Sequence, residues 1–257
     1  MAIHWWRRLL WWRRGPLVTR HPVVLLHGAF GFEQVVVNQT RRAYFQGVRE
    51  RLLKHGVELH APVVAPVAGI ERRAVELVAQ LDAVGPGRLN LVAHSMGGLD
   101  ARYAITHLGL SQRIASLITI GTPHHGTPLA DAGLRLSQRL RLRHVLGAGS
   151  DLLGDLSTGG MEAFNQRVPD APGVFYASIV GRVPPSGEVH PLLRPTHALL
   201  SRRVGLNDGV VPASSQPWGE VLWIVDADHW AQVGWSGSSD STALYEAIVR
   251  ELRARGF

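Results

Sequence analysis

Leu-Asn-Leu-Val at residues 89–92 runs directly into Ala-His-Ser-Met-Gly-Gly at residues 93–98, and a helix-like stretch follows. This order predicts a buried strand, a tight turn with Ser95 at its tip, and a helix. The small side chains of Ala93 and Gly97 allow the helix to begin close to the strand it has just left. Such a turn holds a serine hydroxyl at the carboxyl edge of a sheet, beside helix amides that favour negative charge. The stretch therefore predicts an α/β fold with an exposed serine at a nucleophile elbow, with alanine in place of the motif's first glycine.

The rest of the chain alternates between apolar strands and amphipathic helices. Strands are predicted at residues 23–26, 59–64, 89–93, 114–120, 174–180 and 221–225, and helices at residues 42–55, 70–84, 97–107 and 241–253. Strands that are almost wholly apolar are typical of a parallel sheet covered on both faces. The predicted fold class is therefore α/β, with a mostly parallel sheet flanked by helices.

One stretch departs from this alternation. Between Thr122 and Pro172, leucines and arginines alternate, and glycines then follow at positions 147, 149, 154, 159 and 160. Loops at the carboxyl edge of such sheets often cover a site, so a helical lid is predicted over about residues 126–170. An ordinary helical excursion on the surface is the alternative. The remainder of residues 22–257 is predicted to form a single domain, which suits a chain of 257 residues.

The composition excludes several kinds of chemistry. The chain has 0 cysteines, so it has no disulfide, no cysteine nucleophile and no thiolate metal site. The formal net charge is +7, and nearly all of the positive charge is arginine. Most of these arginines are interpreted as a solvated surface, and no nucleic-acid partner is predicted.

The amino-terminal segment, residues 1–21, combines aromatic and basic side chains. Its paired residues are Trp5, Trp6, Arg7, Arg8, Trp11 and Trp12. The segment lacks the uninterrupted apolar stretch of a secretory signal, and no run in the chain is long enough to span a bilayer. Tryptophan with arginine suits the bilayer interface, whereas the alternative is that the tryptophans pack on the body of the protein. The sequence thus predicts a cytoplasmic protein, with peripheral attachment to a membrane as one of these two alternatives, and fixes no oligomeric state.

A serine hydroxyl becomes nucleophilic only when a base removes its proton, and a carboxylate usually orients that base. His229 is the predicted base because it follows the strand at 221–225 and precedes the final helix. Asp208, in an Asn-Asp-Gly turn after an earlier strand, is the predicted acid on chain order. Asp226 and Asp228 are rivals, but they lie on the same strand end as His229 and reach it less easily.

The oxyanion formed by attack needs two amide donors. One is predicted at Met96, directly after the serine, and the other at Ala29, in a glycine-containing loop after the first strand. The substrate pocket is predicted to include Phe30, His94, His125 and Val210. No metal and no cofactor is predicted.

These segments together resemble the bacterial triacylglycerol lipases and related esterases of the α/β-hydrolase fold. The resemblance rests on the segments at 24–32, 91–103, 121–126, 163–165, 207–215 and 228–229. It implies acyl ester or lipid substrates, an acyl-enzyme mechanism and the Ser95, Asp208 and His229 roles given above. Such lipases commonly bind calcium through aspartates, one of them two positions after the catalytic histidine. That position is Ala231 here, so the calcium site is predicted to be absent.

The expected function is therefore carboxylic ester hydrolysis by a lipase or esterase. A thioesterase, phospholipase or acyltransferase would use the same three residues on a different bond or acceptor. A protein without catalytic activity that binds membranes through its amino-terminal segment is the alternative from another class.

Overall fold

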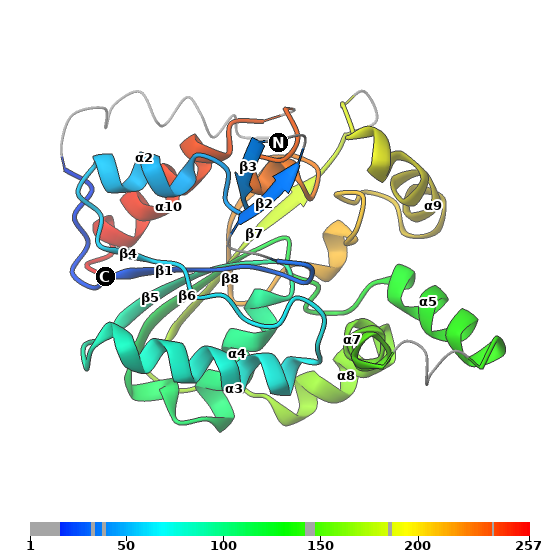
Figure 1. Ribbon diagram of the computed structural model, residues 1–257, viewed down its shortest axis with the longest axis horizontal. Coiled ribbons are helices and arrows are strands. Elements are labelled where there is room, and N and C mark those ends of the chain that lie inside the picture. The colour runs from blue at the N-terminus through cyan, green and yellow to red at the C-terminus, as the bar shows by residue number, and fades with distance from the viewer. Residues whose placement is uncertain (1–15, 32–33, 38–39, 142–146, 185–186, 238) are drawn as a thin grey trace.

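Six parallel strands form the central sheet of the computed structural model (Figure 1). In the order β4-β1-β5-β6-β7-β8 they are Leu59–His60, Val23–Leu26, Leu89–His94, Ile114–Ile120, Phe175–Arg182 and Glu220–Asp226. The structure describes residues 16–31, 34–37, 40–141, 147–184, 187–237 and 239–257. All sheet neighbours pair in parallel, so the carboxyl ends of the strands meet at one edge. The predicted α/β class with a parallel sheet is confirmed.

Successive residues of β1 divide the core into two layers. Val23 and Leu25 belong to the apolar cluster under α2 and α10, whereas Val24 and Leu26 belong to the cluster under α3 and α4. Because successive side chains of a strand point to opposite faces, a strand covered on both faces is apolar throughout. This is why the apolar run at 23–26 predicts a central strand.

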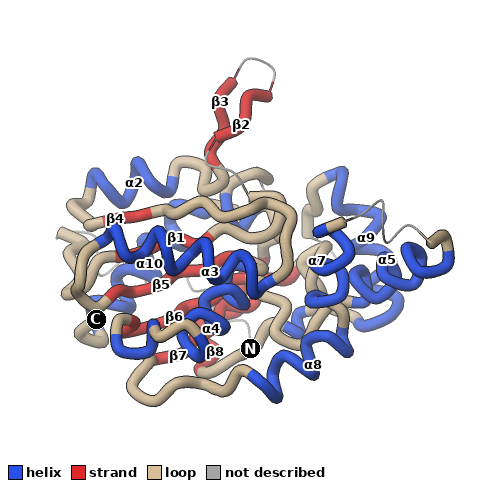
Figure 2. The backbone as a smooth tube through the Cα atoms, turned by 60° about the horizontal axis from the view of Figure 1, so that its bottom comes forward, coloured by secondary structure: helices blue, strands red, loops and turns tan. Residues whose placement is uncertain are grey.

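Two pairs of helices cover the two faces of the sheet (Figure 1). The helices are α2 (Val48–Lys54), α3 (Ile70–Leu81), α4 (Gly97–His107), α5 (Pro128–Arg139), α7 (Ala148–Leu156), α8 (Thr158–Arg167), α9 (Arg194–Val204) and α10 (Ser241–Ala254). Helices α2 and α10 lie on one face, and α3 and α4 lie on the other. Helices α5, α7, α8 and α9 gather at one end of the molecule, beyond the carboxyl edge of the sheet (Figure 2).

The predicted helix at 42–55 was wrong in its first half. A hairpin of β2 (Gln34–Val37) and β3 (Thr40–Ala43) precedes the helix and projects from the body (Figure 2). The helix begins only at Val48, after Gly47 adopts a φ of 68°. A left-handed residue cannot continue a helix, and glycine adopts that conformation without strain.

Two further differences concern the strand at 59–64 and helix α9. The strand ends at His60 because Pro62 has no amide hydrogen for a ladder hydrogen bond. Helix α9 was not predicted because its sequence is polar and mostly exposed, with Leu200 as its only buried residue. Residues Trp5, Trp6, Arg7, Arg8, Trp11 and Trp12 lie outside the described part of the chain. Among the residues that are described, no helix has the length and apolar character to cross a bilayer.

Candidate active site

Ser95 stands at the tip of the turn between β5 and α4 and has a φ of 55°. A non-glycine residue in this region is strained, and two hydrogen bonds hold it there. The Ser95 amide donates to the Ile120 carbonyl at 2.9 Å, and the Thr122 hydroxyl donates to the Ser95 carbonyl at 2.7 Å. A Cβ at Gly97 would lie 2.7 Å from the His27 carbonyl oxygen. The small residue predicted at this position is therefore required by the closeness of β1.

Ser95, His229 and Asp208 come together from three separate loops at the carboxyl edge of the sheet. The Ser95 Oγ lies 3.0 Å from the His229 Nε2, and the His229 Nδ1 lies 2.8 Å from the Asp208 Oδ2. The His229 amide also donates to the Asp208 carbonyl at 2.8 Å. Ser95 is half-buried, whereas Asp208 and His229 are buried. This is the order of nucleophile, base and orienting carboxylate that acyl transfer requires.

Asp208 is surrounded by hydrogen-bond donors. Its Oδ1 accepts from the amides of Val210 at 2.9 Å and Val211 at 2.7 Å. Its Oδ2 accepts from the Gln232 Nε2 at 3.0 Å as well as from His229. Both buried oxygens of the carboxylate therefore have hydrogen-bond partners. These contacts hold Asp208 in place against the His229 ring.

The rival carboxylates have other partners. Asp226 forms an exposed ion pair with Arg182. The buried Asp228 accepts from the amides of Trp230 and Ala231 and so closes the turn that carries His229. The position of Asp228 is structural, and Asp208 alone of the three contacts the histidine ring.

The two amides predicted to bind the oxyanion, those of Ala29 and Met96, have no partner in the part of the chain that the structure describes. Ala29 follows Gly28, where a Cβ would lie 2.6 Å from the Ser95 Cβ. The oxyanion loop thus lies directly against the serine. Both amides are available for a ligand oxygen, as an oxyanion site requires.

Arg73 holds the loop at His27 and Gly28 in place, and it could not be recognised as a site residue from the sequence. Its Nη2 donates to the carbonyls of His27 at 3.0 Å and Gly28 at 3.2 Å. Its Nε donates to the Asp100 Oδ2 at 2.8 Å, on the helix that begins after Ser95. Both side chains are buried. One signal existed, because Arg73 interrupts the buried face that Ile70 begins on α3.

Replacing Gly28 by alanine is expected to lower kcat about 100-fold. The new Cβ would lie 2.6 Å from the Ser95 Cβ and 2.9 Å from the Tyr44 Oη, so the loop or the serine must move. A displacement of about 1 Å at a reacting centre costs rates of this order. Steady-state turnover of a soluble ester measures the effect. Gly87→Ala is the matched control, because a Cβ there meets nothing within 4 Å, and equal activity of both variants would contradict the prediction.

The four residues predicted to line the pocket lie in different environments. Phe30 is 66% exposed and has a φ of 57°. Val210 is half-buried beside Asp208, and His125 is exposed at a shallow hollow of about 390 Å³. His94 is buried, with its ring centroid 4.5 Å from that of His229. Its side chain therefore lies against His229 within the protein and offers no exposed surface to a substrate, so the prediction that it lines the pocket was wrong.

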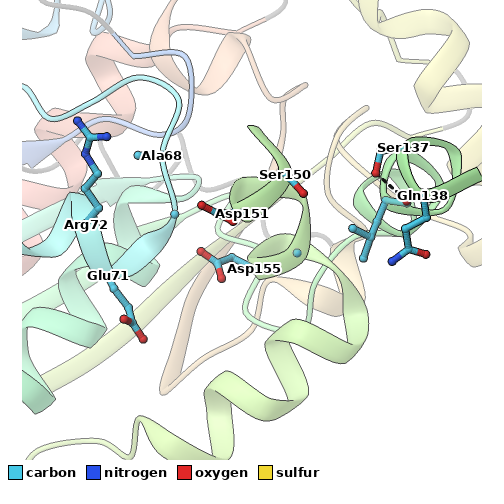
Figure 3. Close-up of a pocket in the computed structure, with 11 residues that line it drawn as sticks. Ala68, Glu71, Arg72, Ser137, Gln138, Ser150, Asp151 and Asp155 are labelled. Carbon is cyan, nitrogen blue, oxygen red and sulfur yellow. Dashed lines mark hydrogen bonds between the residues drawn. The ribbon is translucent and has the colours of Figure 1, made fainter. Parts of the chain in front are cut away.

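A larger cavity of about 620 Å³ lies between α3, α5 and α7. Figure 3 shows Asp151 and Asp155 of α7 pointing toward the start of α3. The Asp155 Oδ2 accepts from the Ile70 amide at 2.7 Å, and burial raises the pKa of Asp155. None of the described residues that line this cavity belongs to the predicted site. Asp155 therefore caps α3 and fastens α7 to the body.

Metal-ligating side chains are dispersed in the described residues. No group of three or more histidine, aspartate or glutamate side chains there has the arrangement of a metal site. The predicted absence of calcium remains a prediction.

Comparisons with known proteins show which sequences this chain is similar to. Residues 18–145 match the model of the PGAP1-like alpha/beta domain. The chain is 33% identical over 150 residues to a triacylglycerol lipase of Pseudomonas fragi, covering 57% of this chain and 47% of that protein. It is also 33% identical over 207 residues to triacylglycerol lipase 2 of Saccharomyces cerevisiae, covering 75% of this chain and 62% of that protein. The chain thus spans less than two thirds of the length of either relative.

Solved structures agree on the fold. The mature form of the Bacillus licheniformis lipase BlEst2 is similar with a TM-score of 0.70 and 23% identity, covering 91% of this chain and 92% of that one. The metagenomic carboxyl esterase MGS0156 is similar with a TM-score of 0.74 and 21% identity, covering 95% and 79%. The sheet, the elbow and these likenesses point the same way: the chain has the α/β-hydrolase fold and is related to lipases and esterases that share it.

Proposed function

We propose that this protein hydrolyses carboxylic esters through a covalent acyl-enzyme. The Ser95 Oγ attacks the ester carbonyl while His229 accepts the hydroxyl proton at Nε2. His229 then gives that proton to the leaving alcohol, and the acyl group stays on Ser95. A water molecule, deprotonated by His229, attacks the acyl-enzyme, and the carboxylic acid leaves as Ser95 regains its proton. The amides of Ala29 and Met96 stabilise the oxyanion in both halves.

The strongest support for this proposal is the geometry of Ser95, His229 and Asp208. The distances of 3.0 Å from Ser95 to His229 and 2.8 Å from His229 to Asp208 lie within hydrogen-bond range, at the same sheet edge as two amides that have no partner among the described residues. Hydrogen bonds of this length allow proton transfer without rearrangement of the side chains. Asp208 fixes the tautomer with its proton on Nδ1, which leaves Nε2 free to act as the base.

The substrates are proposed to be acyl esters of lipids. The support is that the relatives at 33% identity are named triacylglycerol lipases. Thioesters, phospholipids and acyl transfer to an alcohol remain the alternatives, because they use the same nucleophile and base. The helices at the carboxyl edge, α5, α7 and α8, are proposed to act as the lid.

A substrate series on the purified protein is the direct test of this function. We expect turnover of p-nitrophenyl esters and of triglyceride emulsions, with slower release of coenzyme A from acyl-coenzyme A and of fatty acid from phospholipid vesicles. Preference for either of the last two would replace the proposed substrate class. Absence of turnover on all four would contradict ester hydrolysis.

The amino-terminal Trp/Arg segment, residues 1–21, is proposed to bind a membrane surface, with the protein cytoplasmic and peripheral to that membrane. Its tryptophans suit headgroup depth and its arginines suit lipid phosphates. Co-sedimentation with anionic vesicles is expected to be stronger for the full chain than for a chain that starts at residue 16. Equal binding by the two would contradict this role.

A further inference from the structure

Three side chains behind the triad, two of them buried and one half-buried, have no role in the reaction described above. They are Tyr44, directly after β3, His94, the last residue of β5, and Gln232, in the short helix η6 (Ala231–Val233). His94 and Gln232 are buried, and Tyr44 lies between His94 and the oxyanion loop. The Gly28 amide donates to the Tyr44 Oη at 3.0 Å, and the same Oη lies 2.8 Å from the His94 Nδ1.

Gln232 connects to the triad from the other end. Its Nε2 donates to the Asp208 Oδ2 at 3.0 Å. A Cβ at Gly121 would lie 2.2 Å from the Gln232 Oε1, and one at Gly181 would lie 2.0 Å from the Nε2. Two glycines at the ends of neighbouring strands therefore leave the space in which this amide lies. Its orientation is fixed, because a carboxylate only accepts hydrogen bonds and the NH₂ group must face Asp208.

The two ends meet at a pair of buried polar atoms. The His94 Nε2 and the Gln232 Oε1 are both buried, and within the described residues neither atom has a hydrogen-bond partner. The nearby Gln232 side chain and His229 backbone favour a proton on the His94 ring and so raise its pKa. Burial and the neighbouring His229 lower that pKa further than these raise it, so His94 is neutral and carries one ring proton.

These contacts decide where the proton lies. A buried N–H needs an acceptor. Because Nδ1 faces the Tyr44 Oη, we assign the Gln232 side chain and the His229 backbone, which act on the same ring, to Nε2. The proton of neutral His94 then belongs on Nε2, and Nδ1 can only accept. The Tyr44 hydroxyl must donate its proton to Nδ1, while its oxygen accepts from Gly28.

We propose that Tyr44, His94 and Gln232 form a one-way chain of hydrogen-bond donors from the oxyanion loop to the acid, and that they are positioning residues of the active site. The donors run from the Gly28 N–H to Tyr44, from Tyr44 to the His94 Nδ1, from the His94 Nε2–H to the Gln232 Oε1, and from the Gln232 Nε2–H to Asp208. The role of these three residues in catalysis rests on the proposed function, whereas the series of hydrogen bonds between them does not.

The arrangement has two consequences for the reaction. It ties the loop that carries the Ala29 amide to the carboxylate that orients His229, although the two lie far apart in sequence. It also keeps a neutral ring 4.5 Å from His229, so the imidazolium that forms during attack does not face a second cation. Hydrogen bonds aligned in one direction polarise one another, so loss of one member weakens the others.

The tautomer of His94 is the first test and needs no activity. Long-range ¹⁵N–¹H NMR of the ¹⁵N-labelled full chain, with the resonances assigned by their loss in His94→Gln, reports which ring nitrogen is protonated. We expect the Nε2–H form in the wild type and a changed Nδ1 resonance in Tyr44→Phe. A proton on Nδ1 in the wild type would overturn the proposed series of hydrogen bonds, even if the enzyme hydrolyses esters as proposed.

A double-mutant cycle tests the connection through the site. Tyr44→Phe and Gln232→Met each remove hydrogen bonds and retain most of the side-chain volume. We expect each to lower kcat about three- to tenfold with little change in KM, as loss of one or two buried hydrogen bonds does. The double variant should be no slower than the worse single variant, because one break already interrupts the chain. Effects that multiply would overturn the proposal.

Tyr245, which lies outside the proposed series of hydrogen bonds, offers a matched control. The Tyr245 hydroxyl is buried without a hydrogen-bond partner among the described residues, and its ring packs edge-on against Phe45 at 5.6 Å. Tyr245→Phe should leave kcat within about twofold of the wild type, since no hydrogen bond is lost. Thermal melts establish that each variant is folded. If Tyr245→Phe slows the reaction as much as Tyr44→Phe, the effect belongs to core packing and the proposed chain is wrong.

Discussion

Replacing Ser95 by alanine is expected to lower kcat on a p-nitrophenyl ester by about 10⁴- to 10⁶-fold and to leave the fold intact. The hydroxyl is the proposed nucleophile, and nothing else at the site can form the acyl-enzyme. Losses of this size follow removal of a triad nucleophile in other serine hydrolases. Residual hydrolysis would come from the two oxyanion amides and from His229 acting on water. Turnover measured with burst-phase titration quantifies the loss.

Stability provides the control for this variant. Ser95 has a φ of 55°, so alanine at this position keeps the strain and loses only the hydroxyl contact with His229. A melting temperature close to that of the wild type is therefore expected. Retained turnover in a folded Ser95→Ala protein would remove Ser95 from its proposed role.

The second large effect is expected from Arg73→Met. Asp100 would lose Arg73, the one cation paired with its carboxylate among the described residues, and would remain buried, which costs about 3–5 kcal/mol of unfolding free energy at neutral pH. The carbonyls of His27 and Gly28 would lose their donor as well, so kcat should fall with stability. Urea unfolding followed by circular dichroism measures the first effect, and ester turnover under folding conditions measures the second.

The pH dependence of this variant has a definite sign. Burial raises the pKa of Asp100 from its ordinary value of 3.8 to about 6 even with Arg73 present, and loss of the guanidinium raises it further. The folded state then binds the proton more tightly than the unfolded state does. Stability of Arg73→Met should therefore increase as the pH falls from 7 through the folded pKa of Asp100 toward 3.8.

A double variant separates the ion pair from the loss of packing. Arg73→Met with Asp100→Leu removes both charges, and apolar replacement of a buried pair is often close to neutral. Most of the lost unfolding free energy should return in the double variant. If it is as unstable as the single variant, the unpaired carboxylate is not the cause.

Much of the fold could be predicted from the sequence, because buried parallel strands leave an unmistakable pattern. The strand at Ile114–Ile120 and the helix at Gly97–His107 begin and end where predicted. The hairpin β2–β3 could not be predicted, because Thr40–Ala43 reads equally well as the start of the helix that follows. Helix α9 escaped because it buries little and so lacks a clear apolar period.

The site shows a similar division. Ser95, Asp208 and His229 could be chosen from chain order and from the strand ends that carry them, and the structure brings these three side chains together. Tyr44 and Gln232 could not be chosen, because their importance depends on contacts across distant segments. His94 was expected in the substrate pocket, yet its side chain is buried. The catalytic roles of Ser95, Asp208 and His229 stay predictions.

Labelling by a fluorophosphonate tests the central claim most directly. The reagent reacts only with a serine that a neighbouring base has activated, and it places a phosphonyl group in the oxyanion site. Peptide mass spectrometry of the labelled full chain should find one adduct, on Ser95, and the adduct should be absent from His229→Ala and Ser95→Ala. No labelling of the folded wild type, or an adduct on any other residue, would contradict Ser95 as the nucleophile of an ester hydrolase.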